Sequence, residues 1–150
     1  DIKASKENRC IPIDFVRNVG EEANMPFSVG GGIKSLEEIR QLLEAGAERV
    51  VLGTVAAETP SFVREASERF GKSTIAVCID VKYSFWGKLQ VVARNGRKVV
   101  SADVVGFAKE MEQMGAGELL IQSVNKDGTY QGLEVAVHWL GRQLGFHRGR

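Results

Sequence analysis

The most constraining feature of this sequence is a run of three glycines that closes the segment 29–32, directly after a short apolar stretch. Ser35 and Glu38 follow with the spacing of a capping box, so we expect a helix to begin just after the glycines. A strand, a glycine loop and a helix N-terminus together offer free backbone N–H groups, and these suit a phosphate. The alternative is that the glycines only make a tight turn between strand and helix.

The same arrangement recurs farther along the chain, where the apolar run 49–52 is followed by Gly53 and Thr54. Two loops of this kind at neighbouring strand ends predict one anion site built from backbone N–H groups and the Thr54 hydroxyl. Gly31, Gly32, Gly53 and Thr54 are therefore candidate phosphate-binding residues.

Strand and helix patterns alternate along the rest of the chain, and the helical stretches have about ten to fifteen residues. This alternation predicts right-handed βαβ units on a parallel sheet. We expect strands at 26–29, 49–52, 74–81 and 118–121, and helices at 13–19, 36–43, 60–70, 104–114 and 133–144.

One segment interrupts the alternation. Asn95-Gly96 lies between two apolar runs, 89–93 and 97–100, which predicts a β-hairpin inserted after the strand 74–81. The aromatic residues at 83–86 precede this hairpin. They could cover a ligand, but we expect them to pack under the ribbon.

The chain also contains an internal repeat, because the segment 45–54 is similar to the segment 114–123. A repeat of this size predicts two similar halves that face each other across a barrel or sheet. It places Arg49 and Glu118 at equivalent strand starts with opposite charge, and Thr54 and Ser123 at equivalent strand ends.

In parallel α/β proteins ligands bind at the carboxyl ends of the strands. Asp80 ends an almost wholly apolar strand, so burial is expected to raise its pKa toward that of a useful general base. The alternative is an ion pair with Lys82. Asp127, after the next strand, could complete an acid/base pair, although Asp127-Gly128 is also a common turn dipeptide.

Composition bounds the classes of function. The chain has 150 residues, 43% of them hydrophobic, and a net charge of +1. These values predict one globular domain over residues 1–145, with a disordered basic tail at 146–150. The balanced charge argues against nucleic-acid binding, and no apolar run is long enough to span a bilayer.

The cysteine and histidine residues give little indication of a disulfide framework or a metal site. Cys10 and Cys78 do not form a disulfide framework, and we expect Cys78 to be a small core residue. His138 and His147 lack metal-ligand spacing, so no metal or cofactor is predicted. A cytoplasmic protein is expected.

Taken together, the motifs resemble those of the cyclase subunits of imidazole glycerol phosphate synthase, a family of histidine biosynthesis. The similarity runs from Asp1 to about Gly132 and is carried by the segments 1–5, 29–33, 76–82, 115–118 and 127–129. The resemblance implies a (β/α)8 barrel, of which this chain would hold four to five βα units as a half-barrel. It also implies a glutaminase partner that supplies ammonia to a phosphoribosyl-linked aminoimidazole carboxamide substrate.

The resemblance assigns a role to each candidate residue. Asp80 and Asp127 would be catalytic, and Arg49 and Glu118 would belong to a charged ring that gates an ammonia tunnel. The remaining candidates would contact the substrate and its phosphate, namely Gly31, Gly32, Gly53, Thr54, Ser123 and Gly128.

The chain also departs from the family pattern. The catalytic aspartate of the family's first strand has no counterpart here, so we expect little or no activity from this chain alone. Gly53 stands where the family commonly has Asn. A half-barrel has open strand edges, which predict a homo-oligomer. Two alternatives are an acetamidino-forming enzyme of surface-polysaccharide sugars and a non-catalytic, self-associating phosphate-binding half-barrel.

Overall fold

The structure is a computed structural model that describes residues 1, 4, 7, 9–23 and 25–124. The helix expected at 133–144 and the basic tail at 146–150 lie outside the described residues.

The described part alternates between strands and helices, as the sequence predicts. The strands are β1 (Ser28–Gly30), β2 (Arg49–Leu52), β3 (Ile75–Tyr83), β4 (Leu89–Ala93), β5 (Lys98–Ser101) and β6 (Glu118–Ser123). The helices are α1 (Ile13–Glu22), α2 (Leu36–Glu44), α3 (Thr54–Glu58), α4 (Pro60–Phe70) and α5 (Val104–Gln113), with a 3-10 turn η1 (Lys72–Thr74).

Local side-chain chemistry sets where the helices begin. The Ser35 hydroxyl accepts from the Glu38 backbone N–H, and the Glu38 carboxylate accepts from the Ser35 N–H at 2.9 Å, which confirms the capping box. Asp103 caps α5 in the same way by accepting from the Gly106 N–H at 2.9 Å. Thr59 precedes α4 but its side chain makes no capping bond, and Pro60 at the first position favours the start of this helix.

The sheet is parallel at its centre. β1 pairs with β2, β2 with β3, and β3 with β6, all in the parallel sense. The first part of β3 pairs with β2 and the last part pairs antiparallel with β4. β6 pairs along one edge of β3. β2 and β4 pair along the other edge, β2 with its first part and β4 with its last part. Among the described strands β1, β5 and β6 each have one unpaired edge.

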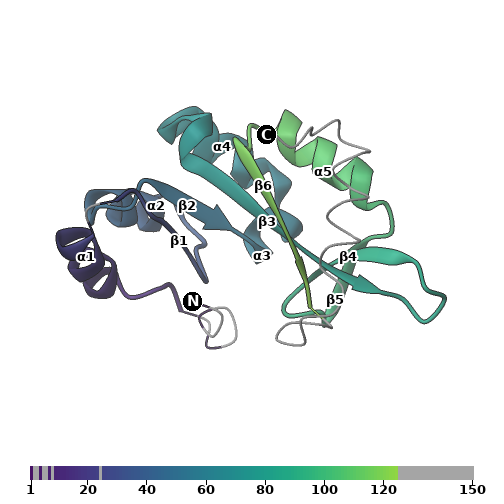
Figure 1. The fold of residues 1–150 in the computed structure, drawn as a ribbon. Coiled ribbons are helices and arrows are strands. Elements are labelled where there is room, and N and C mark those ends of the chain that lie inside the picture. Colours follow the sequence, from purple (N-terminus) through teal and green to yellow (C-terminus); the bar gives the residue numbers. More distant parts are fainter. Residues whose placement is uncertain (2–3, 5–6, 8, 24, 125–150) are drawn as a thin grey trace, which may run out of the picture.

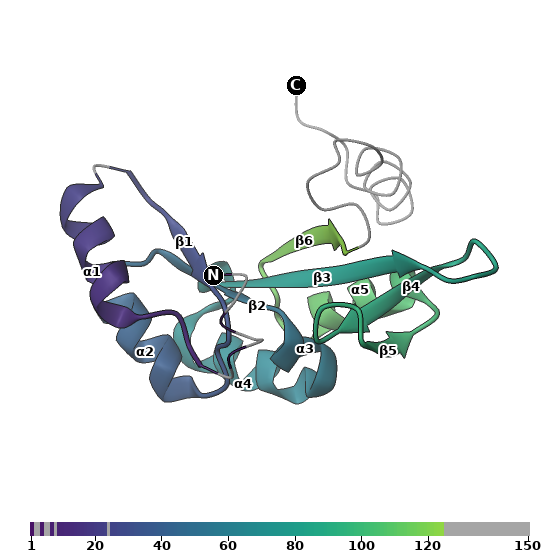
Figure 2. The same ribbon diagram turned by 90° about the horizontal axis from the view of Figure 1, so that it is seen from below.

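The helices pack on one face of this sheet, as Figure 2 shows for α1 to α5. Alternation along each strand directs every second side chain toward that helical layer. The large, fully buried side chains of β2 and β3 belong to this set: Val50, Leu52, Ile75, Val77, Ile79 and Val81. The intervening side chains face the other side of the sheet, and no described helix covers that side (Figure 1). This arrangement agrees with a partial (β/α)8 barrel.

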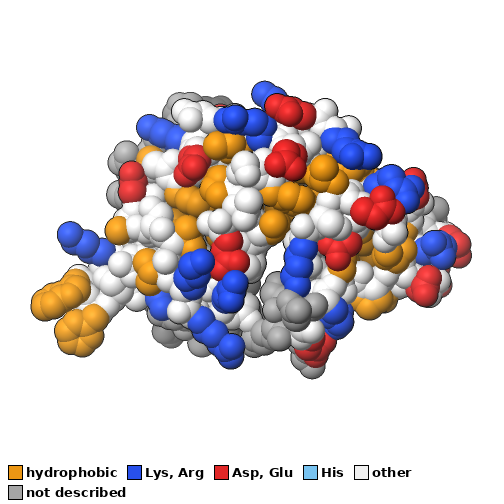
Figure 3. All heavy atoms as spheres, turned by 180° about the vertical axis from the view of Figure 1, so that it is seen from behind, with side chains coloured by type: hydrophobic (Ala, Val, Ile, Leu, Met, Phe, Trp, Pro, Cys, Tyr) orange, Lys and Arg blue, Asp and Glu red, His pale blue; other side chains and the backbone are white. Residues whose placement is uncertain are grey.

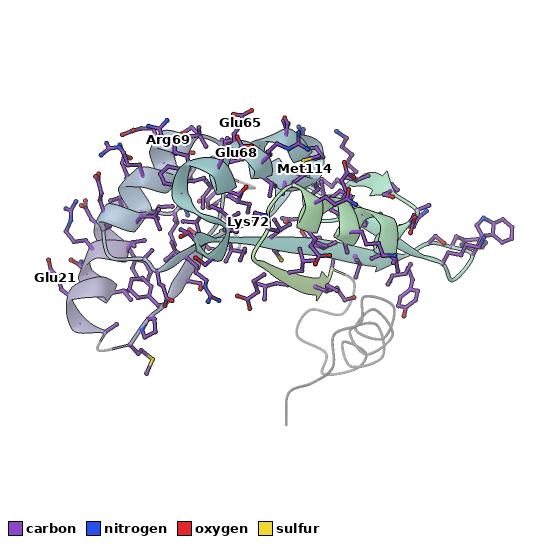
Figure 4. The ribbon with its side chains drawn as sticks, turned by 90° about the horizontal axis from the view of Figure 1, so that it is seen from above. Glu21, Glu65, Glu68, Arg69, Lys72 and Met114 are labelled. Carbon is purple, nitrogen blue, oxygen red and sulfur yellow. The ribbon has the colours of Figure 1, made fainter. Side chains whose placement is uncertain are left out.

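The ends of α4 and α5 meet through a small residue. The buried Ser67 hydroxyl on α4 lies 3.0 Å from the Met114 carbonyl, and Gly115 follows with a φ of +101°. A Cβ on Gly115 would lie 2.3 Å from the Ser67 Oγ, so only glycine allows this approach. Figure 4 shows Met114 and Lys72 at this end of the molecule, where the two helices terminate.

The inserted β-hairpin is confirmed. β4 and β5 pair antiparallel around a turn whose two central residues, Asn95 and Gly96, have the positive φ of a primed turn, and Arg94 before them also has a positive φ. Lys82 on β3 donates to the Gly96 carbonyl at 2.6 Å and ties the turn to the sheet.

The expected packing of the aromatic residues under this ribbon is wrong. Phe85 is 95% exposed and Trp86 is 85% exposed, with the two rings 5.5 Å apart in an edge-to-face contact. The β3–β4 turn closes tightly through the Ser84–Lys88 backbone bond of 2.7 Å, so its tip extends past every element that could cover it. Figure 3 shows apolar side chains projecting at the side of the molecule where this hairpin lies.

None of the helices that the structure describes combines the length and the apolar character that a bilayer crossing requires.

Candidate functional site

A cavity of about 1300 Å³ lies at the carboxyl ends of the parallel strands. Its walls come from the loops after β1 and β2, from β3 and β6, and from the β4–β5 turn. The sheet order explains why these segments meet, since the ends of adjacent parallel strands share one edge. The cavity thus joins both glycine loops and Asp80, which the sequence predicts to lie together.

The glycine loop after β1 is shaped by its contacts with the N-terminal segment. Gly31 and Gly32 have φ values of +129° and +67°, and a Cβ on Gly32 would lie 1.8 Å from the Arg9 carbonyl oxygen. The tight-turn explanation therefore accounts for why glycine is needed here. The backbone of the loop still lines the cavity, so phosphate binding by this loop stays a prediction.

The second loop differs in this respect. Gly53 has a negative φ of −111°, and a Cβ built on it meets nothing within 4 Å. Thr54 begins α3 and lines the cavity together with Gly53. The sequence analysis missed α3, because five residues carry too little periodicity to reveal a helix.

Asp80 emerges from β3 into the cavity. Burial raises the pKa of its carboxyl group above the ordinary value, and a weak hydrogen bond from Cys78 partly opposes that rise. The alternative ion pair with Lys82 is wrong, because Lys82 instead donates to the Gly96 carbonyl and no described residue forms a salt bridge with Asp80.

Cys78 was expected to be a small core residue, but it lies in the cavity wall. Strand alternation places it on the same side of β3 as Asp80, where it lines the cavity. Its Sγ atom lies 3.9 Å from the Asp80 Oδ1 and 3.7 Å from the Gln122 Oε1. Burial, followed by the negative charge of Asp80, raises the pKa of the thiol to about 12, so it is a thiol and not a thiolate at neutral pH.

On β6 the cavity is lined by Gln122 and not by Ser123. Gln122 is the register partner of Asp80, while Ser123 is only 5% exposed and is absent from the cavity wall. The sequence analysis chose Ser123 because the repeat aligned it with Thr54. The alternation Leu119, Ile121, Ser123 would have indicated that these three side chains share the buried face.

Four basic side chains stand along the cavity wall: Lys34, Arg94, Arg97 and Lys98. Glu58 of α3 accepts from Arg94 at 2.7 and 3.1 Å and from Lys98 at 3.2 Å, and Arg94 chiefly lowers the pKa of this carboxyl group. The sequence analysis did not identify this cluster, since α3 and the hairpin turn are far apart in the chain. It ties the Gly53–Thr54 loop to the inserted hairpin.

The opposite charges at the strand starts do meet. Arg49 on β2 and Glu118 on β6 form an ion pair of 2.6 Å that reaches across β3. The pair lies at the amino ends of the strands, away from the cavity. Both side chains are more than a third exposed, so the pair contributes little to stability. A role in ammonia passage stays a prediction.

Asp127 and Gly128 lie outside the described residues, so the second catalytic carboxylate stays a prediction. Within the described part of the chain, no group of three or more His, Cys, Asp and Glu side chains is arranged to hold a metal ion.

Comparison with known proteins identifies similar chains. Residues 1–141 match the family model described as histidine biosynthesis protein. The chain is 43% identical over 139 residues to the imidazole glycerol phosphate synthase subunit HisF of Thermococcus onnurineus (strain NA1), covering 91% of this chain and 54% of that protein. It is 42% identical, with the same coverage, to the HisF subunit of Pyrococcus furiosus. The chain thus spans about half the length of these curated relatives.

Proposed function

Because the chain belongs to the histidine biosynthesis protein family, we propose that it carries part of a HisF-type cyclase site. In this proposal the cavity binds a ribulose phosphate-type substrate, and Asp80 transfers protons during an ammonia-dependent ring closure. The similarity of this chain to two HisF subunits favours this activity over acetamidino transfer to a sugar.

One observation carries the proposal: Asp80 shares its cavity with both glycine loops. Burial raises the pKa of the Asp80 carboxyl group, and this shift is in the direction that general acid/base catalysis favours. The loops offer backbone N–H groups, and Thr54 offers a hydroxyl, at the same rim. A substrate held there by its phosphate would therefore present its reacting part to Asp80.

The ammonia supply is part of the same proposal. The Arg49–Glu118 pair would form part of the entrance for ammonia at the amino ends of the strands, where a glutaminase subunit would dock. Asp127 and Gly128 would complete the catalytic and substrate-binding sets on the loop after β6.

The test is ammonia-dependent turnover of a phosphoribosyl-linked aminoimidazole carboxamide, measured beside phosphate binding by calorimetry. Asp80→Asn is compared with Asp14→Asn, a matched change at a highly exposed residue of α1. Turnover that Asp80→Asn abolishes and Asp14→Asn retains supports the cyclase. Phosphate binding without turnover supports the non-catalytic half-barrel. If the chain shows neither turnover nor phosphate binding, both the cyclase and the phosphate-binding half-barrel are wrong.

We further propose that copies of this chain associate through the unpaired edges of β1 and β6, since exposed strand edges pair readily. Sedimentation at tens of micromolar is expected to show a dimer or larger species, and a stable monomer would contradict association.

A further inference from the structure

Three polar side chains converge on the cavity side of the sheet: Cys78 and Asp80 from β3, and Gln122 from β6. Asp80 and Gln122 are direct register partners on adjacent parallel strands, and Cys78 lies one position earlier on the same face of β3. The resemblance assigned a role only to Asp80. Cys78 and Gln122 therefore form an unassigned part of the cavity wall.

The thiol lies beside both neighbours and can donate its proton to either of the two oxygens, one at a time. Cys78 carries one proton, and its Sγ atom lies within weak hydrogen-bonding distance of the Asp80 Oδ1 and of the Gln122 Oε1. This contact turns the amide oxygen of Gln122 toward β3, which leaves the Nε2 donors for the cavity. Among the described residues Cys78 is also the one hydrogen-bond partner of the Asp80 carboxylate, so that group keeps accepting capacity toward a ligand.

The result is a donor beside an acceptor. An amide N–H group from Gln122 and a carboxylate oxygen from Asp80 complement a ligand group that has an acceptor next to an N–H donor. A carboxamide has this arrangement. A carboxylate offers only acceptors and would also be repelled by the Asp80 charge. Val51 and Leu120 line the cavity nearby and provide apolar contact for a flat ring.

We propose that Gln122 is a specificity-determining residue that donates to the carbonyl oxygen of a substrate carboxamide, while Asp80 accepts from the carboxamide N–H and Cys78 is the positioning residue for both. The inference rests on the proposed function, because it names the chemical group that the same site distinguishes.

The experiment measures dissociation constants by calorimetry for three ligands on the full chain. They are 5-aminoimidazole-4-carboxamide ribonucleotide, its 4-carboxylate analogue, and ribose 5-phosphate. The unmodified chain is expected to prefer the carboxamide to the carboxylate. Gln122→Met removes the donor at nearly constant volume, so it should weaken carboxamide binding about tenfold while ribose 5-phosphate binding stays the same.

Two cysteine variants separate positioning from packing. Cys78→Ala removes the donor and should reduce the preference for the carboxamide, whereas Cys78→Ser keeps a donor and should restore most of it. Cys10→Ala is the matched control, because Cys10 is the other free cysteine and does not line the cavity. It should leave all three dissociation constants unchanged.

The outcomes are distinguishable. If none of the three ligands binds the unmodified chain, the proposed function fails. If ribose 5-phosphate binds but Gln122→Met leaves the carboxamide preference intact, only the inference about Gln122 is overturned. Should Gln122→Met not fold, Gln122→Glu replaces it, and an unaltered preference in that variant likewise contradicts the inference.

Discussion

The two glycine loops of the cavity allow a paired test of what each glycine does. In Gly32→Ala the new Cβ would lie 1.8 Å from the Arg9 carbonyl oxygen, at a backbone φ of +67°. In Gly53→Ala the new Cβ meets nothing within 4 Å, at a φ of −111°. The added methyl group therefore clashes with the backbone at Gly32 and enters open space at Gly53.

The magnitudes follow from these geometries. A left-handed conformation costs a non-glycine residue about 1–2 kcal/mol, and relieving contact with a fixed backbone atom costs about 1–3 kcal/mol. Replacing glycine by alanine also restricts the backbone of the unfolded chain, which stabilises the folded state by about 0.4–1 kcal/mol. Gly32→Ala should thus lower the free energy of unfolding by about 1–4.5 kcal/mol. Gly53→Ala should change it by less than about 1 kcal/mol, because the new Cβ meets no neighbouring atom.

Equilibrium urea unfolding followed by far-UV circular dichroism measures both variants. Tryptophan fluorescence is less suitable, because Trp86 is already 85% exposed in the folded chain and Trp139 lies outside the described residues. The reasoning would be refuted if Gly32→Ala lost less than about 0.5 kcal/mol, or if the two variants lost equal amounts. Calorimetry with inorganic phosphate on Gly53→Ala then checks the site, because this change keeps the backbone N–H and should leave phosphate affinity unaltered.

Three further predictions concern charge and exposure. Burial raises the pKa of Asp80 in the folded state, so its stabilising contribution is complete below the unfolded pKa and is lost as the pH rises through the folded value. Asp80→Asn should therefore increase stability at pH 7 and increase it less at pH 4, measured by urea unfolding at both values. Glu58→Gln removes the ion pairs to the hairpin while keeping one acceptor oxygen, and it should cost under about 1 kcal/mol, with faster amide exchange confined to α3 and residues 94–98. Trp86→Ala should leave the free energy of unfolding within about 0.5 kcal/mol of the unmodified chain, and a larger loss would show that the aromatic tip packs against something.

The sequence contained enough information to predict most of the elements. Local signals predict the capping box at Ser35 and Glu38, the hairpin at Asn95-Gly96 and the buried strand around Asp80, because each depends on residues close together in the chain. The gathering of both glycine loops around Asp80 follows from the parallel topology. Such features need no knowledge of tertiary contacts.

The features that the sequence analysis missed depend on space or on very short segments. Gln122 and Cys78 become visible only when strand alternation is applied with the actual register of β3 and β6. Glu58 meets Arg94 through a tertiary contact between α3 and the hairpin. Phe85 was expected to be covered because aromatic rings are usually buried, but the turn carries it beyond the sheet.

The way β3 exchanges partners along its length has a consequence for how this family can diversify. Its first half belongs to the parallel framework, and its second half supports a ribbon anchored by Lys82 and by Glu58. The length and the side chains of the β4–β5 turn can consequently differ between homologues while the parallel framework beneath it keeps its packing. Such grafts would remodel one wall of the cavity as a separable module, and they offer a route to new ligand preferences that leaves the glycine loops intact.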